Sequence, residues 1–195
     1  MNAVLDAPRQ WPVELYDNAE HYEIVDGNIV ELPPMGAKAQ ITASNLQAEL
    51  NVFAKRHRMG TVGMETLIKL PQLEDRQRRP DIIFVPSDRW PAALGLPEGN
   101  AWPILPALVV EVVSRFDLAE ELNQKIEECF HAGVDQVWIV FPEQRTAWIF
   151  ESPSKVSILR SGDSFDGGTL LPGFRLALDE LMPPPAGDQR TSLQS

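Results

Sequence analysis

Three charged side chains stand in segments that are otherwise apolar. Asp81 opens the short run 82–86, Glu111 lies at the centre of the run 108–113, and Lys125 interrupts the apolar stripe of a helix-like segment. An ionised group that leaves water costs several kcal/mol unless it is paired or binds a metal. Carboxylates are the ligands that Mg²⁺ and Mn²⁺ prefer, and these ions keep several waters for chemistry. Asp81 and Glu111 therefore predict a divalent metal site if their segments are neighbouring strands.

The run 108–113 must be a strand for this geometry to arise. Side chains alternate along a strand, so Val109, Glu111 and Val113 share one face, and Leu108 begins the opposite face. Both faces are apolar apart from Glu111. A strand of this kind is covered on both sides, as in an α/β domain.

Lys125 belongs to the helix predicted over 118–132. It lies three residues after Leu122 and four before Cys129, which places it on the margin of the apolar stripe, whereas the acidic residues of this helix, Glu128 among them, are expected to face largely away. A lone lysine there can extend its charge to water while its methylenes pack. Beside Glu111 and Asp81, we expect the ammonium to point back over the preceding strand.

The remaining elements form a single predicted α/β domain over residues 1–182. A hairpin is predicted around Asp26-Gly27-Asn28, because this turn tolerates positive φ. The mixed central sheet is flanked by helices, residues 1–10 are loose, and 183–195 form a disordered tail. The predicted segments are the hairpin 22–32, the helices 39–58 and 118–132, a brief helix at 179–182, and the strands 61–70, 80–86, 108–113, 136–141, 146–151 and 156–160. The helix 39–58 is expected to be amphipathic, with Ile41, Leu46, Leu50 and Phe53 on its apolar stripe.

Composition excludes several classes of protein. The net charge of −11 argues against a broad basic surface for nucleic acid, although clustered carboxylates at a metal site would also be acidic. The basic stretches 55–58 and 76–79 are expected to be a solvated helix end and a solvated loop. The single Cys129 excludes an internal disulfide and a multi-cysteine zinc site, and it favours a reducing cytoplasm. No apolar run is long enough to span a membrane.

Other residues have weaker patterns. Glu23 and Glu65 are candidates for a further acidic contact, but a surface carboxylate fits each of them better. Ser114 and Asp117 fit helix capping better than metal binding. Among the tryptophans, Trp138 and Trp148 lie in predicted core strands. On the long loop 86–106, Trp90 and Trp102 are expected to form a dimer contact or to cover an apolar face.

These pieces, taken in order, resemble a known family. The residues that carry the resemblance are Tyr22 to Gly27, Arg79 to Ile82, Leu108 to Ser114 with Asp117, Lys125, Ala132 to Val134 before Val137-Trp138, and Leu171 to Phe174. They resemble the PD-(D/E)XK nuclease signature and, more narrowly, the Uma-two family of restriction-endonuclease-like proteins. The resemblance implies a restriction-endonuclease-like core, cleavage of DNA that depends on Mg²⁺ or Mn²⁺, and a homodimer. Asp81 and Glu111 would be the metal ligands, and Lys125 would orient the nucleophile and stabilise charge in the transition state.

The sequence departs from the general nuclease pattern at two places. That pattern has lysine two residues after the second acid, where this chain has Val113, so Lys125 on the following helix takes the role. The stretch 38–40 has no histidine, which family members tend to carry near the start of the long helix. This absence and the acidic charge support an alternative, a catalytically inactive nuclease-fold module for binding or assembly. A purely structural protein is a third hypothesis.

Overall fold

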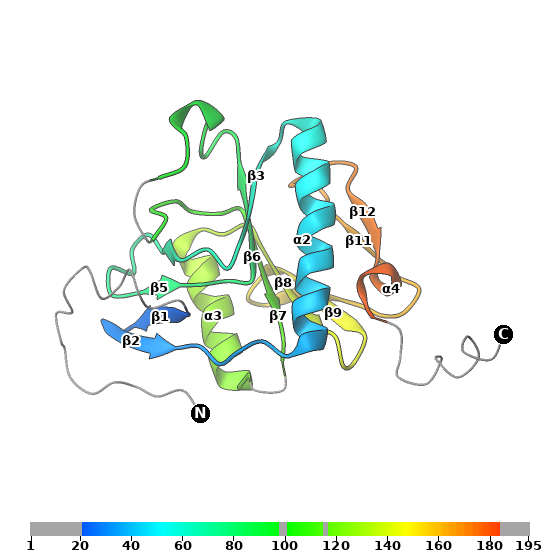
Figure 1. The fold of residues 1–195 in the computed structure, drawn as a ribbon, viewed down its shortest axis with the longest axis horizontal. Coiled ribbons are helices and arrows are strands. Elements are labelled where there is room, and N and C mark those ends of the chain that lie inside the picture. Colours follow the sequence, from blue (N-terminus) through cyan, green and yellow to red (C-terminus); the bar gives the residue numbers. More distant parts are fainter. Residues whose placement is uncertain (1–20, 98–100, 115–116, 184–195) are drawn as a thin grey trace.

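A six-stranded mixed sheet forms the centre of the molecule (Figure 1). The computed structural model describes residues 21–97, 101–114 and 117–183. The strand order is β10-β9-β8-β7-β6-β3, and only β7 and β8 are parallel. Helix α3 (Ala119–Ala132) joins these two strands, as a parallel pair requires. The other strands are β3 (Gly60–Met64), β6 (Ile82–Pro86), β7 (Leu108–Val112), β8 (Gln136–Phe141), β9 (Thr146–Ser152) and β10 (Lys155–Leu159). The predicted mixed α/β architecture is confirmed.

Two smaller sheets flank the centre. The predicted N-terminal hairpin is confirmed as β1 (Tyr22–Val25) and β2 (Asn28–Glu31), and its turn has positive φ at both Asp26 and Gly27. Strand β1 also pairs with β5 (Gln77–Arg78), which pairs with β4 (Ile68–Lys69). The remaining elements are η1 (Ala92–Leu94), β11 (Ser164–Asp166), β12 (Arg175–Ala177) and α4 (Leu178–Leu181).

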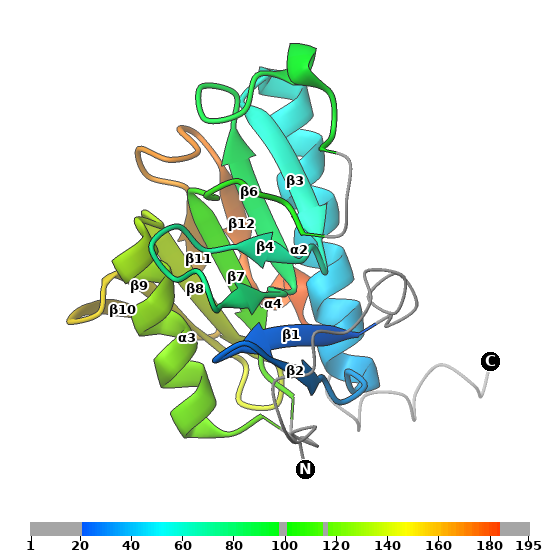
Figure 2. The ribbon, with the colours of Figure 1, turned by 90° about the vertical axis from the view of Figure 1, so that its left-hand side faces the viewer.

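Helices cover both faces of the central sheet, with α3 on one side and α2 (Ala37–His57) on the other (Figure 2). On the α2 side, Leu46 packs in one core cluster with Val110. On the α3 side, Ile126 packs in a second cluster with Val109. The alternation predicted for the strand 108–113 is therefore observed, because consecutive residues enter different cores.

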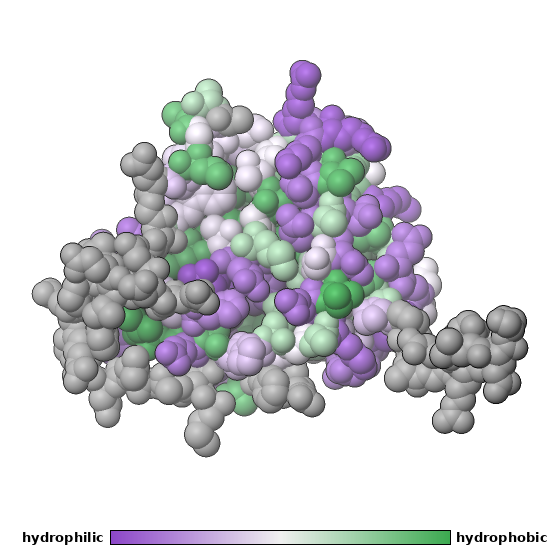
Figure 3. Space-filling model, viewed as in Figure 1, coloured by the Kyte–Doolittle hydropathy of each residue, from purple (hydrophilic) through white to green (hydrophobic). Residues whose placement is uncertain are grey.

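Helix α2 ends where the sequence predicts, but its buried stripe differs from the prediction. The outer surface of α2 is mostly hydrophilic with apolar residues among the polar ones (Figure 3). Ile41, expected in the buried stripe, is 52% exposed. The helix runs to His57 with Arg58 as its C-cap in the left-handed conformation with φ 54°, which agrees with the predicted end at residue 58.

The predicted strand 61–70 is wrong as a single element. Glu65 has a positive φ of 47°, which turns the chain between β3 in the central sheet and β4 in the small sheet. An extended strand cannot pass through that conformation.

The tryptophans separate into buried and exposed members. Trp102 is buried against Ile68, and Trp90 packs edge-on against it with ring centroids 6.4 Å apart. Of the two roles expected for this pair, a dimer contact or the covering of an apolar face, Trp102 has the second. Trp148, predicted in the core, is 38% exposed on β9.

No helix in the described ranges is long and apolar enough to cross a membrane. The predictions of a loose segment at 1–10 and a disordered tail fall outside the described residues, apart from Pro183.

The face of α2 that holds the sheet can be tested by truncation. Leu46→Ala should lower the free energy of unfolding by about 2–5 kcal/mol, because Leu46 is fully buried and its loss leaves a cavity. Ile41→Ala on the same helix is the matched control and should change it by less than about 0.5 kcal/mol. Urea unfolding measures both values, and equal effects would contradict this orientation of α2.

Candidate active site

The register of β6 against β7 brings Asp81 and Glu111 together. Ile82 is paired with Val110, so the same register one residue further places Asp81 opposite Glu111. Residues directly opposite in an antiparallel pair project from the same face. Asp81 is fixed there because the backbone N–H of Val112 donates to its Oδ2 at 2.5 Å. The expectation that both acids lie on neighbouring strands and converge is met.

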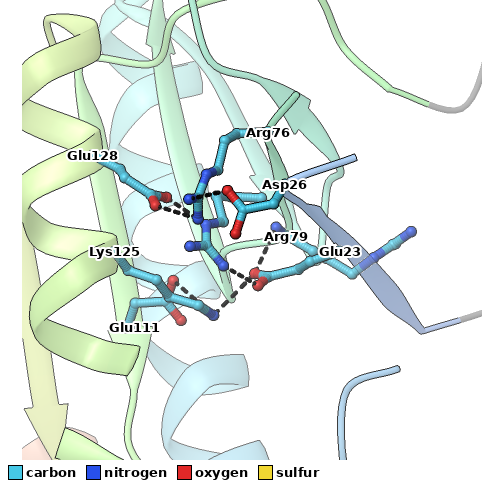
Figure 4. Close-up of polar contacts among 8 residues, drawn as sticks. Glu23, Asp26, Arg76, Arg79, Glu111, Lys125 and Glu128 are labelled. Atoms are coloured by element: carbon cyan, nitrogen blue, oxygen red, sulfur yellow. Dashed lines mark hydrogen bonds and ion pairs between the residues drawn. The ribbon is translucent and has the colours of Figure 1, made fainter. Parts of the chain in front are cut away.

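Lys125 reaches back from α3 to the same point (Figure 4). Its Nζ lies 3.7 Å from Oε1 of Glu111 and 2.9 Å from Oε1 of Glu23, and its side chain is only 18% exposed. The ammonium therefore points toward the carboxylates and not along the surface into water. The structure brings Asp81, Glu111 and Lys125 into one site.

The sequence prediction placed Glu23 wrongly. It was expected at the surface, but it is 2% exposed, from its place on β1. Its Oε2 accepts from Arg78 Nη1 at 2.8 Å, and its Oε1 accepts from the backbone N–H of Arg79 at 3.0 Å. The partners lie more than 50 residues away, so no local pattern in the hairpin could reveal this burial.

A chain of ion pairs continues from Glu23 away from the acids (Figure 4). Arg78 Nε donates to Oε2 of Glu128 at 2.6 Å, and Arg76 contacts both Glu128 and Asp26. Arg78 and Glu128 are buried. The stretch 76–79 is therefore not a solvated loop as predicted, because it supplies the cations that tie the hairpin to α3. Glu128, expected to face away, is part of this chain.

A cleft opens over Asp81, Glu111 and Lys125 between the hairpin side and α3. Its wall includes His21, Glu65, Arg79 and Asp117 as well as apolar side chains. Glu65 is partly exposed and lies 3.8 Å from His21 Nε2. Asp117 accepts from the backbone N–H of Ser114, while Leu118 is the N-cap of α3 without a side-chain cap bond, so the capping role predicted for Asp117 is wrong.

Burial is the largest influence on the pKa values of Asp81 and Glu111. It raises the pKa of Asp81 to about 7 and the pKa of Glu111 to about 8, although Lys125 lowers both. The charge of Asp81 adds to the increase at Glu111. Burial would raise the pKa of Glu23 as well, but Lys125, Arg78 and the Arg79 N–H outweigh it and hold that pKa below its ordinary value. The positive charge near Asp81 and Glu111 is therefore too small to offset their burial, whereas the cations and the N–H around Glu23 more than offset its burial.

A hard divalent cation would supply the positive charge that Asp81 and Glu111 lack. Two carboxylates face one cleft, and no set of three histidine, cysteine or acidic side chains arranged to hold a metal occurs in the described part of the chain. Mg²⁺ is commonly held by one or two carboxylates, with waters and substrate phosphate completing its shell. Asp81 and Glu111 are therefore suited to this kind of open site rather than to a closed structural one.

Comparison with known proteins identifies the family. The model of the Uma2 family, described as "Putative restriction endonuclease", matches residues 8–179. The chain belongs to the Uma2 family. Among solved structures, it is similar to a protein from Anabaena variabilis described as "a putative nuclease belonging to DUF820", with a TM-score of 0.72 and 17% sequence identity. That match covers 88% of this chain and 97% of the other, and it supports the restriction-endonuclease-like fold. No curated protein matches the sequence.

The raised pKa of Glu111 predicts that this buried acid lowers the stability of the metal-free Uma2 protein. Glu111 keeps its proton to higher pH in the folded state than in the unfolded state, so without metal its contribution falls as pH rises from about 4 toward 8. Glu111→Gln should therefore be more stable than wild type at pH 8, on the order of 1 kcal/mol, and should lose this advantage near pH 4. Thermal unfolding with chelator at both pH values measures the difference.

Glu31→Gln, on an exposed position of β2, is the control and should leave the pH dependence unchanged. A Glu111→Gln protein that is less stable than wild type at pH 8 would show that Glu111 is already compensated without metal.

Proposed function

We propose that this protein is a metal-dependent endonuclease that hydrolyses phosphodiester bonds in DNA. The observation that carries the proposal is the convergence of Asp81, Glu111 and Lys125 on one cleft, with Lys125 Nζ 3.7 Å from Glu111. Membership of the Uma2 family supports a nuclease role. Asp81 and Glu111 would hold Mg²⁺ or Mn²⁺.

The residues of the chain have separate roles in this hydrolysis. A bound divalent ion lowers the pKa of a coordinated water and polarises the phosphate. Asp81, which the Val112 N–H holds in place, and Glu111 would hold this ion with their carboxylates. Lys125 orients the attacking water and offsets the negative charge that grows on the phosphate in the transition state. Because these groups are largely withdrawn from solvent, their electrostatic effect is stronger than it would be in water.

The acidic surface limits how DNA can bind. With a net charge of −11, non-specific attraction along a DNA duplex is weak, so binding depends on local cations and on the metal. The same charge and the absence of histidine at 38–40 support the alternative, an inactive nuclease-fold module. Action in the cytoplasm stays a prediction from the single Cys129, which is buried.

Plasmid nicking distinguishes the two functions. Wild type should nick supercoiled DNA with Mg²⁺ or Mn²⁺, and Asp81→Asn or Lys125→Met should slow this roughly 10²-fold or more. Lys38→Met, at an exposed lysine paired with Glu143, is the matched control and should cut at the wild-type rate.

Calorimetric titration with Mn²⁺ should show binding to wild type and its loss in Asp81→Asn. A wild type that binds Mn²⁺ and never nicks DNA would favour the inactive module, and one that does not bind Mn²⁺ would contradict the proposed metal site.

We also propose that two copies associate through the edge strand β10. In the described residues, β10 pairs only with β9, and Val156 and Ile158 are 43% and 45% exposed on it. Ile158 of β10 is paired with Trp148 of β9, and Trp148 is paired in turn with Ile139 of β8. Ile139 belongs to the core on the α3 side, so the apolar face of β10 continues that core. Antiparallel pairing of two copies about Ser157 would place Val156 of each copy opposite Ile158 of the other. Such self-complementarity is what a two-fold interface requires.

Light scattering tests the association. Wild type should have the mass of a dimer, and Ile158→Lys should shift it toward the monomer at micromolar concentration, because a buried unpaired charge opposes the interface. Ile41→Lys, at an equally exposed isoleucine on α2, should leave the mass unchanged. A monomeric wild type, or loss of the dimer only in Ile41→Lys, would exclude this interface.

A further inference from the structure

We propose that Glu23 is a positioning residue that holds the ammonium of Lys125 away from Glu111 and so leaves Glu111 available to a divalent cation. The inference rests on the proposed metal-dependent function and extends it to a residue on the N-terminal hairpin. It assigns a role to the buried carboxylate that the metal site itself does not use.

Two carboxylates compete for the same ammonium. Lys125 Nζ lies 2.9 Å from Glu23 Oε1, within the range of a charge-assisted hydrogen bond. It lies 3.7 Å from Glu111 Oε1, beyond that range. Lys125 is therefore hydrogen-bonded to Glu23, and only its longer-range attraction acts on Glu111.

Glu23 cannot follow Lys125 toward the cleft, because it is itself fixed. Arg78 Nη1 holds Oε2 at 2.8 Å, and the backbone N–H of Arg79 holds Oε1 at 3.0 Å. Arg78 is held in turn by Glu128, 2.6 Å from its Nε. A carboxylate with both oxygens bound to a buried, paired arginine and to backbone is a rigid acceptor.

The absence of Glu23 would redirect Lys125. Its ammonium is largely buried and needs a carboxylate, and Glu111 is the other acid that it contacts. A direct Lys125–Glu111 hydrogen bond would occupy the oxygen that a metal needs, so a cation would have to displace the ammonium first. Glu23 thus lets Lys125 stay close to the site without occupying it.

A double-mutant cycle on metal binding tests this role. The Kd for Mn²⁺ is measured by calorimetry for wild type, Glu23→Gln, Lys125→Met and the double variant. Glu23→Gln should weaken binding about tenfold when Lys125 is present, and by less than about threefold in the Lys125→Met background. Asp117→Asn is the matched control, because Asp117 is another negative charge that acts on Glu111 and its carboxylate is bound to the Ser114 N–H. Its effect on Kd should be the same in both backgrounds.

Equal effects of Glu23→Gln in both backgrounds would overturn the proposal, because Glu23 would then act by its charge or by the fold alone. Circular dichroism and urea unfolding verify that each variant folds. Should Glu23→Gln not fold, Glu23→Asp keeps the charge and draws the carboxylate back from Lys125. It should weaken Mn²⁺ binding only when Lys125 is present.

A crystal structure of metal-free Glu23→Gln, or of Glu23→Asp, gives a readout that needs neither metal nor cleavage. The Lys125–Glu111 distance should shorten from 3.7 Å into hydrogen-bond range. A lysine that stays in place would overturn the positioning role even if wild type cleaves DNA. A wild type that neither binds Mn²⁺ nor cleaves, with a lysine that does move, would contradict the proposed function while the control of Lys125 by Glu23 stands.

Discussion

The withdrawal of two carboxylates from water is the constraint on which the rest of the structure depends. Asp81 and Glu111 lie on adjacent strands of a sheet that is covered on both faces, and burial keeps their pKa values near neutral pH. Desolvation of this kind is tolerated where positive charge is supplied nearby or is delivered by a ligand. The fold supplies part of it through Lys125 and leaves an open cleft through which more can enter.

The buried ion pairs between the hairpin and α3 determine geometry more than stability. Pairs such as Arg78 with Glu23 and Glu128 lose hydration that their mutual attraction only roughly offsets, so they are weak evidence for a stable fold. Their geometry is demanding, however, since each arginine donates from a rigid planar group. The hairpin contributes little to the main core, yet it fixes where the ammonium of Lys125 lies.

Sequence patterns were sufficient wherever the determining contacts were local or strictly periodic. Alternation around Glu111 predicted a strand that enters two cores, and helical spacing predicted the side on which Lys125 lies. Patterns failed where the deciding partner was distant. Nothing near Glu23 indicates that Arg78 will cover it, and no glycine or proline in 65–67 marks the turn at Glu65 that separates β3 from β4. The exposed Ile41 and Trp148 show the converse error, in which an apolar side chain was assumed to be buried.

The distribution of the site along the chain has a consequence for biosynthesis. Glu23 emerges from the ribosome first, Arg78 and Asp81 follow more than 50 residues later, and Lys125 and Glu128 on α3 emerge last. A two-stranded hairpin alone is marginally stable, and β1 must wait for β5 before it pairs further. The site formed by Asp81, Glu111 and Lys125 therefore cannot be complete before α3 has been synthesised and has docked. An incomplete chain that stops before α3 retains Asp81 and Glu111 but lacks Lys125, so the complete charged site requires synthesis of the helix that covers it.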